Sequence, residues 1–229
     1  MKIAGSTALV TGANRGFGRH LAAELAARGA TVWAGARNPD TVDLPGVTAV
    51  RLDITDPAPV AAAAERAGDV TLLVNNAGVS TGTALLDGDL AQIRLELETH
   101  YLGTLSVVRA FAPRIAANDG GTILNVLSWF TFPGVGAYGA AKAAAWSVTN
   151  ALRVELAGRG VRVAGLHVGY MDTEMAAAVP GPKADPAEVA RLAADGIEAG
   201  SYEILADDVA RRVQAGLSGG VAALHPALP

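Results

Sequence analysis

Short apolar runs alternate with longer, alanine-rich stretches along this chain. The apolar runs are continuous, whereas half-buried strands alternate apolar with polar residues, so they are typical of strands covered on both faces of a parallel sheet. We expect strands at Thr7–Val10, Thr31–Gly35, Val47–Leu52, Val70–Val74, Thr122–Leu127 and Val161–His167.

The stretches between these runs have helical character and are bounded by Gly or Pro. They predict helices at Phe17–Arg28, Pro57–Ala67, Leu90–Ala117 and Ala137–Leu156. Alternation of strands and helices implies right-handed crossovers. We therefore expect an α/β fold with a Rossmann-type, doubly wound parallel sheet, in one domain over residues 1–229.

Residues 179–203 differ in composition, with Pro and Gly near the start and two short helical patterns. We expect a small helical lid over the substrate at the carboxyl edge of the sheet, and a plain connecting segment is the alternative. One more helix is expected after Asp207, and the Gly- and Pro-rich tail is expected to carry only a vestigial last strand.

Composition narrows the class of protein. The chain has 229 residues, a formal net charge of −4, no cysteine and four histidines that lie far apart. Disulfides are thereby excluded, no metal site is expected, and nucleic acid is disfavoured because phosphate contacts need a basic face. The start lacks a long apolar segment and no apolar run suits a membrane span, so we expect a cytoplasmic protein.

A glycine-rich turn, Thr11–Gly18, follows the first strand and opens a helix. Gly12 permits the tight turn, Gly16 lets the backbone approach a pyrophosphate, and Gly18 lets the helix pack close to the strand. Free N–H groups and the helix dipole favour an anion there. This context predicts a dinucleotide site, a purely structural turn being the alternative. The cofactor contacts expected from the turn also include Asn14, Arg15 and Phe17.

The end of the second strand suggests which dinucleotide binds. NAD-selective folds usually place an acidic residue there to hold the ribose 2′-hydroxyl, but this chain has Arg37. Guanidinium groups suit phosphate, so Arg37 and Arg15 could hold a 2′-phosphate. We expect NADP(H) to be preferred over NAD(H), the alternative being that both arginines are merely solvated.

With Asn75-Asn76-Ala77-Gly78 and Tyr138-Gly139-Ala140-Ala141-Lys142, the chain resembles the short-chain dehydrogenase/reductase family over nearly its whole length. The resemblance implies that Asp53 contacts the adenine and that the segment after the fourth strand supports the cofactor. It also implies that Thr173 touches the nicotinamide carboxamide, although Val168 stands where the family has proline. The implied cofactor contacts are Asp53, Ile54, Asn75, Ala77, Gly78, Tyr138, Lys142, Gly169 and Thr173.

Tyr138 and Lys142 are the core of the expected proton-transfer site. Their spacing of i to i+4 places both side chains on one helical face. A free tyrosine titrates near ~10, and a nearby ammonium lowers that pKa. Tyr138 can then exchange a proton with a substrate oxygen while hydride moves to or from the nicotinamide. An ordinary helix pair without chemistry is the alternative.

The family also uses a serine to hold the substrate oxygen, and Ser128 is the candidate. It lies ten residues before Tyr138, whereas the family gap is usually two or three residues longer. Counting back by the longer gap reaches Asn125, which can also donate a hydrogen bond, so both residues stay open.

His100 is a second departure from the family pattern. The family typically has an asparagine in this slot of the long helix, where it would hold a water that links Lys142 to solvent. A neutral imidazole can also donate and accept, so His100 is a candidate relay residue that titrates near neutrality. A helix histidine without a catalytic part is the alternative.

Apolar and aromatic residues follow Ser128 and the sixth strand. They predict an apolar ketone, aldehyde or secondary alcohol as substrate, with core or interface aromatics as the alternative. The expected substrate contacts are Trp129, Phe130 and Tyr170, with Phe132, Met171 and Met175 nearby.

The leading hypothesis is thus an NADP(H)-dependent carbonyl reductase or alcohol dehydrogenase. A redox-neutral isomerase, dehydratase or cyclase on the same scaffold, or a non-catalytic dinucleotide-binding protein, are the alternatives. Family members commonly pair through two long helices, so the resemblance implies a homodimer, with a tetramer as the other possibility.

Overall fold

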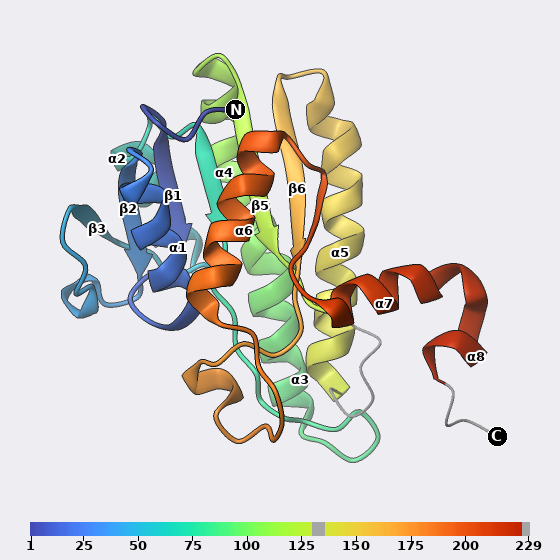
Figure 1. Cartoon of the computed structure of the whole chain (residues 1–229). Coiled ribbons are helices and arrows are strands. Elements are labelled where there is room, and N and C mark those ends of the chain that lie inside the picture. The colour runs from blue at the N-terminus through green and yellow to red at the C-terminus, as the bar shows by residue number, and fades with distance from the viewer. Residues whose placement is uncertain (130–135, 226–229) are drawn as a thin grey trace.

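A computed structural model describes residues 1–129 and 136–225 of the chain. Its centre is a seven-stranded parallel sheet in the order β3-β2-β1-β4-β5-β6-β7 (Figure 1). The strands are β1 Thr7–Thr11, β2 Thr31–Ala36, β3 Val47–Arg51, β4 Leu72–Asn75, β5 Gly121–Val126, β6 Val161–His167 and β7 Glu203–Leu205. The predicted fold class and the six predicted strands are confirmed.

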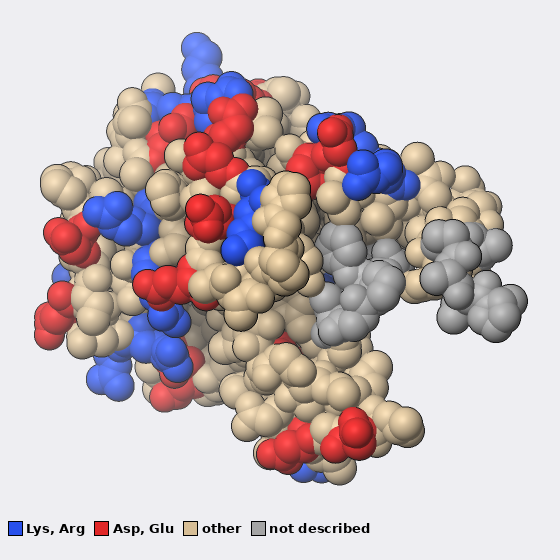
Figure 2. All heavy atoms as spheres, turned by 60° about the horizontal axis from the view of Figure 1, so that its bottom comes forward, with Lys and Arg blue, Asp and Glu red and all other residues tan. Residues whose placement is uncertain are grey.

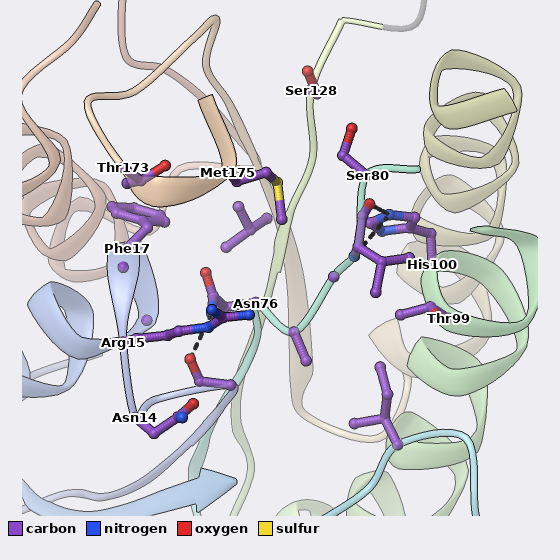
Figure 3. Close-up of a pocket in the computed structure, with 18 of the residues that line it drawn as sticks. Asn14, Arg15, Phe17, Asn76, Ser80, Thr99, His100, Ser128, Thr173 and Met175 are labelled. Carbon is purple, nitrogen blue, oxygen red and sulfur yellow. Dashed lines mark hydrogen bonds between the residues drawn. The ribbon is translucent and has the colours of Figure 1, made fainter. Parts of the chain in front are cut away.

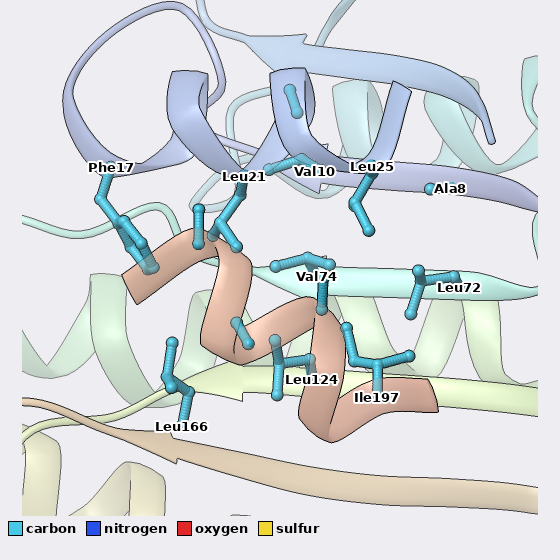
Figure 4. Packing of buried hydrophobic residues seen from close by; sticks show 14 of the residues in the cluster. Ala8, Val10, Phe17, Leu21, Leu25, Leu72, Val74, Leu124, Leu166 and Ile197 are labelled. Atoms are coloured by element: carbon cyan, nitrogen blue, oxygen red, sulfur yellow. The ribbon is translucent and has the colours of Figure 1, made fainter. Parts of the chain in front are cut away.

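Helices cover both faces of the sheet and create two hydrophobic cores. On one face, α1 (Gly16–Ala27) and α6 (Pro186–Ala199) pack over the central strands (Figure 4). The opposite core includes side chains of α2 (Pro57–Arg66), α4 (Thr104–Ala117) and α5 (Gly136–Ala157). Burial on both faces explains why the strand sequences are apolar throughout.

Helix α6 corrects the expectation of two short helical patterns within residues 179–203. Asp185 caps a single helix by accepting a hydrogen bond from the backbone N–H of Ala187, and Gly200 ends it in the left-handed conformation. Val189 and Ile197 enter the core beside α1. The segment is therefore part of the packed fold from Pro186 onward, and a lid role remains a prediction only for residues before it.

The last strand also lies elsewhere than expected. β7 pairs with β6 ahead of the final helices, whereas a vestigial strand was predicted for the tail. The helix expected after Asp207 is confirmed as α7 (Asp208–Gly216). Two short elements follow it, the 3₁₀ turn Leu217–Gly219 and α8 (Gly220–Leu224).

The long helix expected at Leu90–Ala117 is present but changes its winding midway. It comprises α3 (Leu90–Leu97), a π-helical turn η2 (Glu98–Gly103) and α4. The wider π turn contains His100, and such turns are frequent at functional sites. Among the described helices, none is long and apolar enough to cross a membrane.

Candidate active site

A cavity of about 530 Å³ opens where the carboxyl ends of β1, β4 and β5 meet α5 and the π turn. Parallel α/β folds bind ligands at this edge, where the strand order reverses beside β1. Figure 2 shows the molecule hollowed on this face, with charged side chains gathered on its left and mostly uncharged ones on the lobe below. The lining comprises residues 12, 14–18, 36, 37, 52–55, 76–80, 95, 99, 100, 126–128, 138, 142, 168, 171 and 173–175.

The glycine turn has the geometry of a phosphate cradle. Gly12 and Gly16 have φ of +67° and +51°, which favours glycine at both positions. A Cβ on Gly18 would lie 2.2 Å from the carbonyl oxygen of Gly12. Arg15 occupies the N-cap of α1 without a side-chain cap, so the first N–H groups of the helix face the cavity uncapped. These residues fit the pyrophosphate of a dinucleotide.

Asn76 holds the glycine turn in place through hydrogen bonds, a role that was not predicted. Its Nδ2 donates to the carbonyl oxygen of Thr11 at 2.9 Å, and its backbone N–H donates to Thr11 Oγ1 at 2.9 Å. The neighbouring Ala77 N–H donates to the same hydroxyl at 3.0 Å. Figure 3 shows Asn76, with Asn14 and Arg15 of the turn, among the residues that line the cavity. Ala77 and Gly78 line the cavity as expected of cofactor contacts, whereas Asn75 is buried behind it.

Asn125, the alternative holder of the substrate oxygen, is committed to the core. Its Oδ1 accepts a hydrogen bond from Asn75 Nδ2 at 2.8 Å, and its Nδ2 donates to Thr149 Oγ1 at 2.9 Å. It does not line the cavity, whereas Ser128 does. The structure thus favours Ser128 over Asn125 for contact with a substrate.

The expected adenosine contacts gather at the other end of the cavity. Asp53, Ile54 and Arg37 all line it, and Arg37 is exposed. The Asp53 carboxylate accepts hydrogen bonds from the backbone and hydroxyl of Thr55. Arg15 also lines the cavity, but its guanidinium pairs at 2.9 Å with Glu174 of the 3₁₀ turn Glu174–Ala176.

Tyr138 and Lys142 project from the first turns of α5 and approach Ser128. The Lys142 ammonium lies 5.6 Å from the centre of the Tyr138 ring and donates to the carbonyl oxygen of Val126 at 2.9 Å. The expectation of a lowered Tyr138 pKa is corrected, because burial raises it to about 12 and only a hydrogen bond with Ser128 acts in the opposite direction. Burial lowers the pKa of Lys142 to about 8. The phenol is therefore a protonated acid at neutral pH.

His100 lies against this pair from the π turn. Its Nε2 is 2.7 Å from the carbonyl oxygen of Val79, and its ring meets the Tyr138 ring edge to face. A Cβ on Gly78 would come within 2.6 Å of His100 Cε1, so glycine there makes room for the imidazole. Burial and the charge of Lys142 lower the pKa of His100.

A buried carboxylate, Glu96, completes the cluster and was not predicted. Its side chain is 0% exposed, and it stands one helical turn before His100. Burial alone would raise the pKa of Glu96, but its close contact with His100 and the hydrogen bond from Thr81 hold it below its usual value. The i to i+4 spacing of Glu96 and His100 in the predicted helix was the signal that could have revealed it.

The residues predicted to contact the substrate differ in where the structure places them. Trp129 is only 2% exposed, stacks on the His167 ring at 4.6 Å and does not line the cavity, so it is a core residue in place of the predicted contact. Tyr170 is 41% exposed and close enough to Tyr138 to raise its pKa. Phe130 and Phe132 lie outside the described residues.

The segment after β6 contributes several further residues to the cavity. Met171, Thr173 and Met175 line it, which agrees with an apolar substrate end beside the expected carboxamide contact. Gly169 instead turns its N–H to Asp207 Oδ2 at 2.6 Å and does not line the cavity. Among residues 1–129 and 136–225, no group of three His, Asp or Glu side chains is arranged to hold a metal ion.

Comparison with known proteins gives consistent matches. A family model described as short chain dehydrogenase matches residues 6–183. Oxidoreductase UcpA of Escherichia coli K12 is 34% identical over 230 residues, covering 84% of this chain and 88% of that protein. The 1-deoxy-11-beta-hydroxypentalenate dehydrogenase of Streptomyces avermitilis is 35% identical over 204 residues, covering 80% of this chain and 75% of that protein.

A solved structure matches along the entire chain. It is a short chain dehydrogenase from Burkholderia cenocepacia J2315 in complex with NADP, with a TM-score of 0.94 and 40% sequence identity. The match covers 100% of both chains. The architecture of this chain is therefore shared with an NADP-bound protein.

Proposed function

Because the chain belongs to the short-chain dehydrogenase family and is an oxidoreductase of that family, we propose that it interconverts an apolar carbonyl compound and its secondary alcohol with NADP(H). The observation that carries this proposal is the approach of Ser128, Tyr138 and Lys142 to one another at the cavity. The glycine cradle lines the same cavity, so a cofactor and the proton-transfer groups meet in one place.

The residues present fit a nicotinamide dinucleotide. When bound, such a cofactor supplies or accepts the hydride. The N–H groups at the start of α1 would hold the pyrophosphate, and Lys142 would reach the ribose hydroxyls nearest the nicotinamide. Arg37, together with Arg15, would pair with a 2′-phosphate, and the position directly after β2 is occupied by Arg37 and not by an acidic residue. The NADP-bound structure from Burkholderia supports this choice.

Tyr138 acts as the acid in carbonyl reduction. Its raised pKa keeps the phenol protonated, so it donates its proton to the substrate oxygen as negative charge develops there. The Ser128 hydroxyl donates a second hydrogen bond to the same oxygen. In alcohol oxidation Tyr138 must first lose its proton, and the charge of Lys142 favours the phenolate.

The cavity favours a substrate without charge near its reacting carbon. Val79, Leu95, Met171 and Met175 provide apolar lining. Tyr170 does not line the cavity but lies close enough to Tyr138 to affect its pKa. Ligand sites commonly combine such walls with a few polar anchors. A panel of apolar ketones and aldehydes with NADPH tests the proposal: oxidation of NADPH by the wild type supports it, and none across the panel contradicts it.

We also propose a homodimer formed through the α3–α4 and α5 helices. Leu90, Leu95, Leu97 and Leu102 on the first unit and Val154 on α5 are exposed, which leaves apolar side chains on both helices. Sedimentation analysis tests the assembly. A dimer is expected for the wild type, and a monomer for the double variant that carries both Leu102→Glu and Val154→Glu.

A further inference from the structure

Glu96 is a carboxylate sealed from solvent beside the catalytic residues. Its Oε1 accepts a hydrogen bond from the backbone N–H of Thr81 at 2.6 Å. Its Oε2 has no hydrogen-bond partner among the described residues, but it lies 3.3 Å from His100 Nε2. An ionised group is costly to bury unless a nearby charge or hydrogen bond compensates it, so its contact with His100 requires an explanation.

The surroundings of His100 determine where its proton resides. Nε2 faces two acceptors. The carbonyl oxygen of Val79 lies at 2.7 Å, a contact marked by a dashed line at His100 in Figure 3. Glu96 Oε2 lies at 3.3 Å. The competing donor, the Val79 N–H, is farther away at 3.4 Å. Nε2 therefore carries the hydrogen in the neutral ring, which leaves Nδ1 as its proton acceptor.

Charges from the neighbouring elements act on the same ring. Tyr138 and Lys142 approach it from α5, and the ammonium opposes a second positive charge at His100. Glu96 approaches from α3, and its negative charge favours the protonated form of both His100 and Lys142. The carboxylate thus balances two cationic groups that would otherwise exclude one another.

We propose that Glu96 is a positioning residue for the reaction, which holds the Nε2–H tautomer of His100 and supplies the charge that lets Nδ1 receive the proton exchanged at Tyr138. This inference rests on the proposed oxidoreductase function. In alcohol oxidation Tyr138 first passes its own proton to His100, which becomes an imidazolium beside Glu96, and the phenolate then takes the proton of the substrate hydroxyl. In carbonyl reduction the proton returns along the same residues.

Nitrogen NMR of the imidazole rings tests the first half of this inference without any turnover. His100→Asn identifies the His100 signals among the four histidines. The wild type should show the Nε2–H tautomer, and Glu96→Gln should lower the titration midpoint of His100 by about one pH unit, as loss of a close opposite charge does. The exposed Glu98→Gln is the matched control and should change neither.

An Nδ1–H tautomer in the wild type overturns the inference, even if Glu96→Gln does not fold. A midpoint and tautomer in Glu96→Gln equal to those of the wild type overturn it as well. Because these measurements use the free protein, they also give a result if the chain reduces none of the carbonyl compounds, so failure of the proposed function is recognised separately.

Kinetics test whether Glu96 acts through His100. Glu96→Gln should lower kcat at least about tenfold, within the range of proton-transfer contributions, and change KM for the carbonyl substrate less than kcat. In a His100→Asn background the same substitution should cause no further loss of kcat. Because Gln can still accept from Thr81, equal losses in both backgrounds would mean a structural role and overturn the inference.

Discussion

The imidazole of His100 stands edge-on to the phenol ring of Tyr138, with ring centres 5.2 Å apart and planes at 88°. This contact joins the π turn to the start of α5, which are distant in sequence and adjacent at the cavity. The ring of His100, which is predicted to stand in the position of the family asparagine, is therefore in direct contact with the proposed proton donor.

Lys142 should set the alkaline limit of cofactor use. Burial lowers its pKa to about 8, so the free enzyme carries the ammonium below that pH and loses it as pH rises. We expect kcat/KM for NADPH to fall above about pH 8. Lys142→Arg, which stays charged, should remove this alkaline fall in kcat/KM while lowering the maximal rate. If the alkaline fall in kcat/KM were unchanged in this variant, it would belong to another titrating group.

Arg37 should select the 2′-phosphate. Arg37→Asp is expected to reverse the ratio of kcat/KM for NADPH and NADH, because it removes a cation and introduces the acidic residue typical of NAD-binding sites. Arg51→Asp at the end of the neighbouring strand is the control, since Arg51 is exposed but does not line the cavity. An unchanged ratio in Arg37→Asp contradicts the assignment.

Glu174 should compete with the cofactor for Arg15. Both side chains of this ion pair are exposed, so breaking it costs little free energy. The freed Arg15 guanidinium can then bind the 2′-phosphate of the cofactor. Fluorescence titration of Glu174→Gln should show NADPH binding tightened by less than about fivefold, the scale of an exposed pair. Weaker binding in this variant would mean that Glu174 supports the site instead.

Substitution of Ser128 should mainly affect catalysis, whereas substitution of Asn125 should mainly affect stability. Ser128→Ala is expected to lower kcat by about 10²–10³ with little change in Tm, because it removes a hydrogen bond to the reacting oxygen. Asn125→Ala leaves Asn75 and Thr149 without a buried partner, at about 1–3 kcal/mol for each group. Thermal unfolding should therefore shift mainly in Asn125→Ala, and the reverse pattern would exchange their roles.

Much of the fold was predictable because its signals are local. Continuous apolar runs indicated a parallel sheet, and the glycine turn indicated the first crossover. Asp185-Pro186 was also a recognisable helix start, with a capping side chain followed by proline at the first helical position, although α6 was predicted as two shorter patterns. Its burial beside α1 depends on tertiary packing, which a local pattern does not contain.

The site was predictable only in part, for the same physical reason. The spacing of Tyr138 and Lys142 places both on one face of any helix. The π turn around His100 depends on the packing of that helix against its neighbours, and the sequence carries no local sign of it. An aromatic residue after a strand can line a pocket or pack in the core. Trp129 packs in the core because it stacks on His167, a contact that the local sequence does not reveal.

Turnover by Tyr138→Phe is the most direct test of the proposed oxidoreductase mechanism. Phenylalanine keeps the ring that contacts His100 but removes the hydroxyl, so the fold and NADPH binding should persist. With a ketone that the wild type reduces, we predict a kcat lower by about 10²–10⁴ and a dissociation constant for NADPH near that of the wild type. A kcat equal to that of the wild type would contradict Tyr138 as the proton donor.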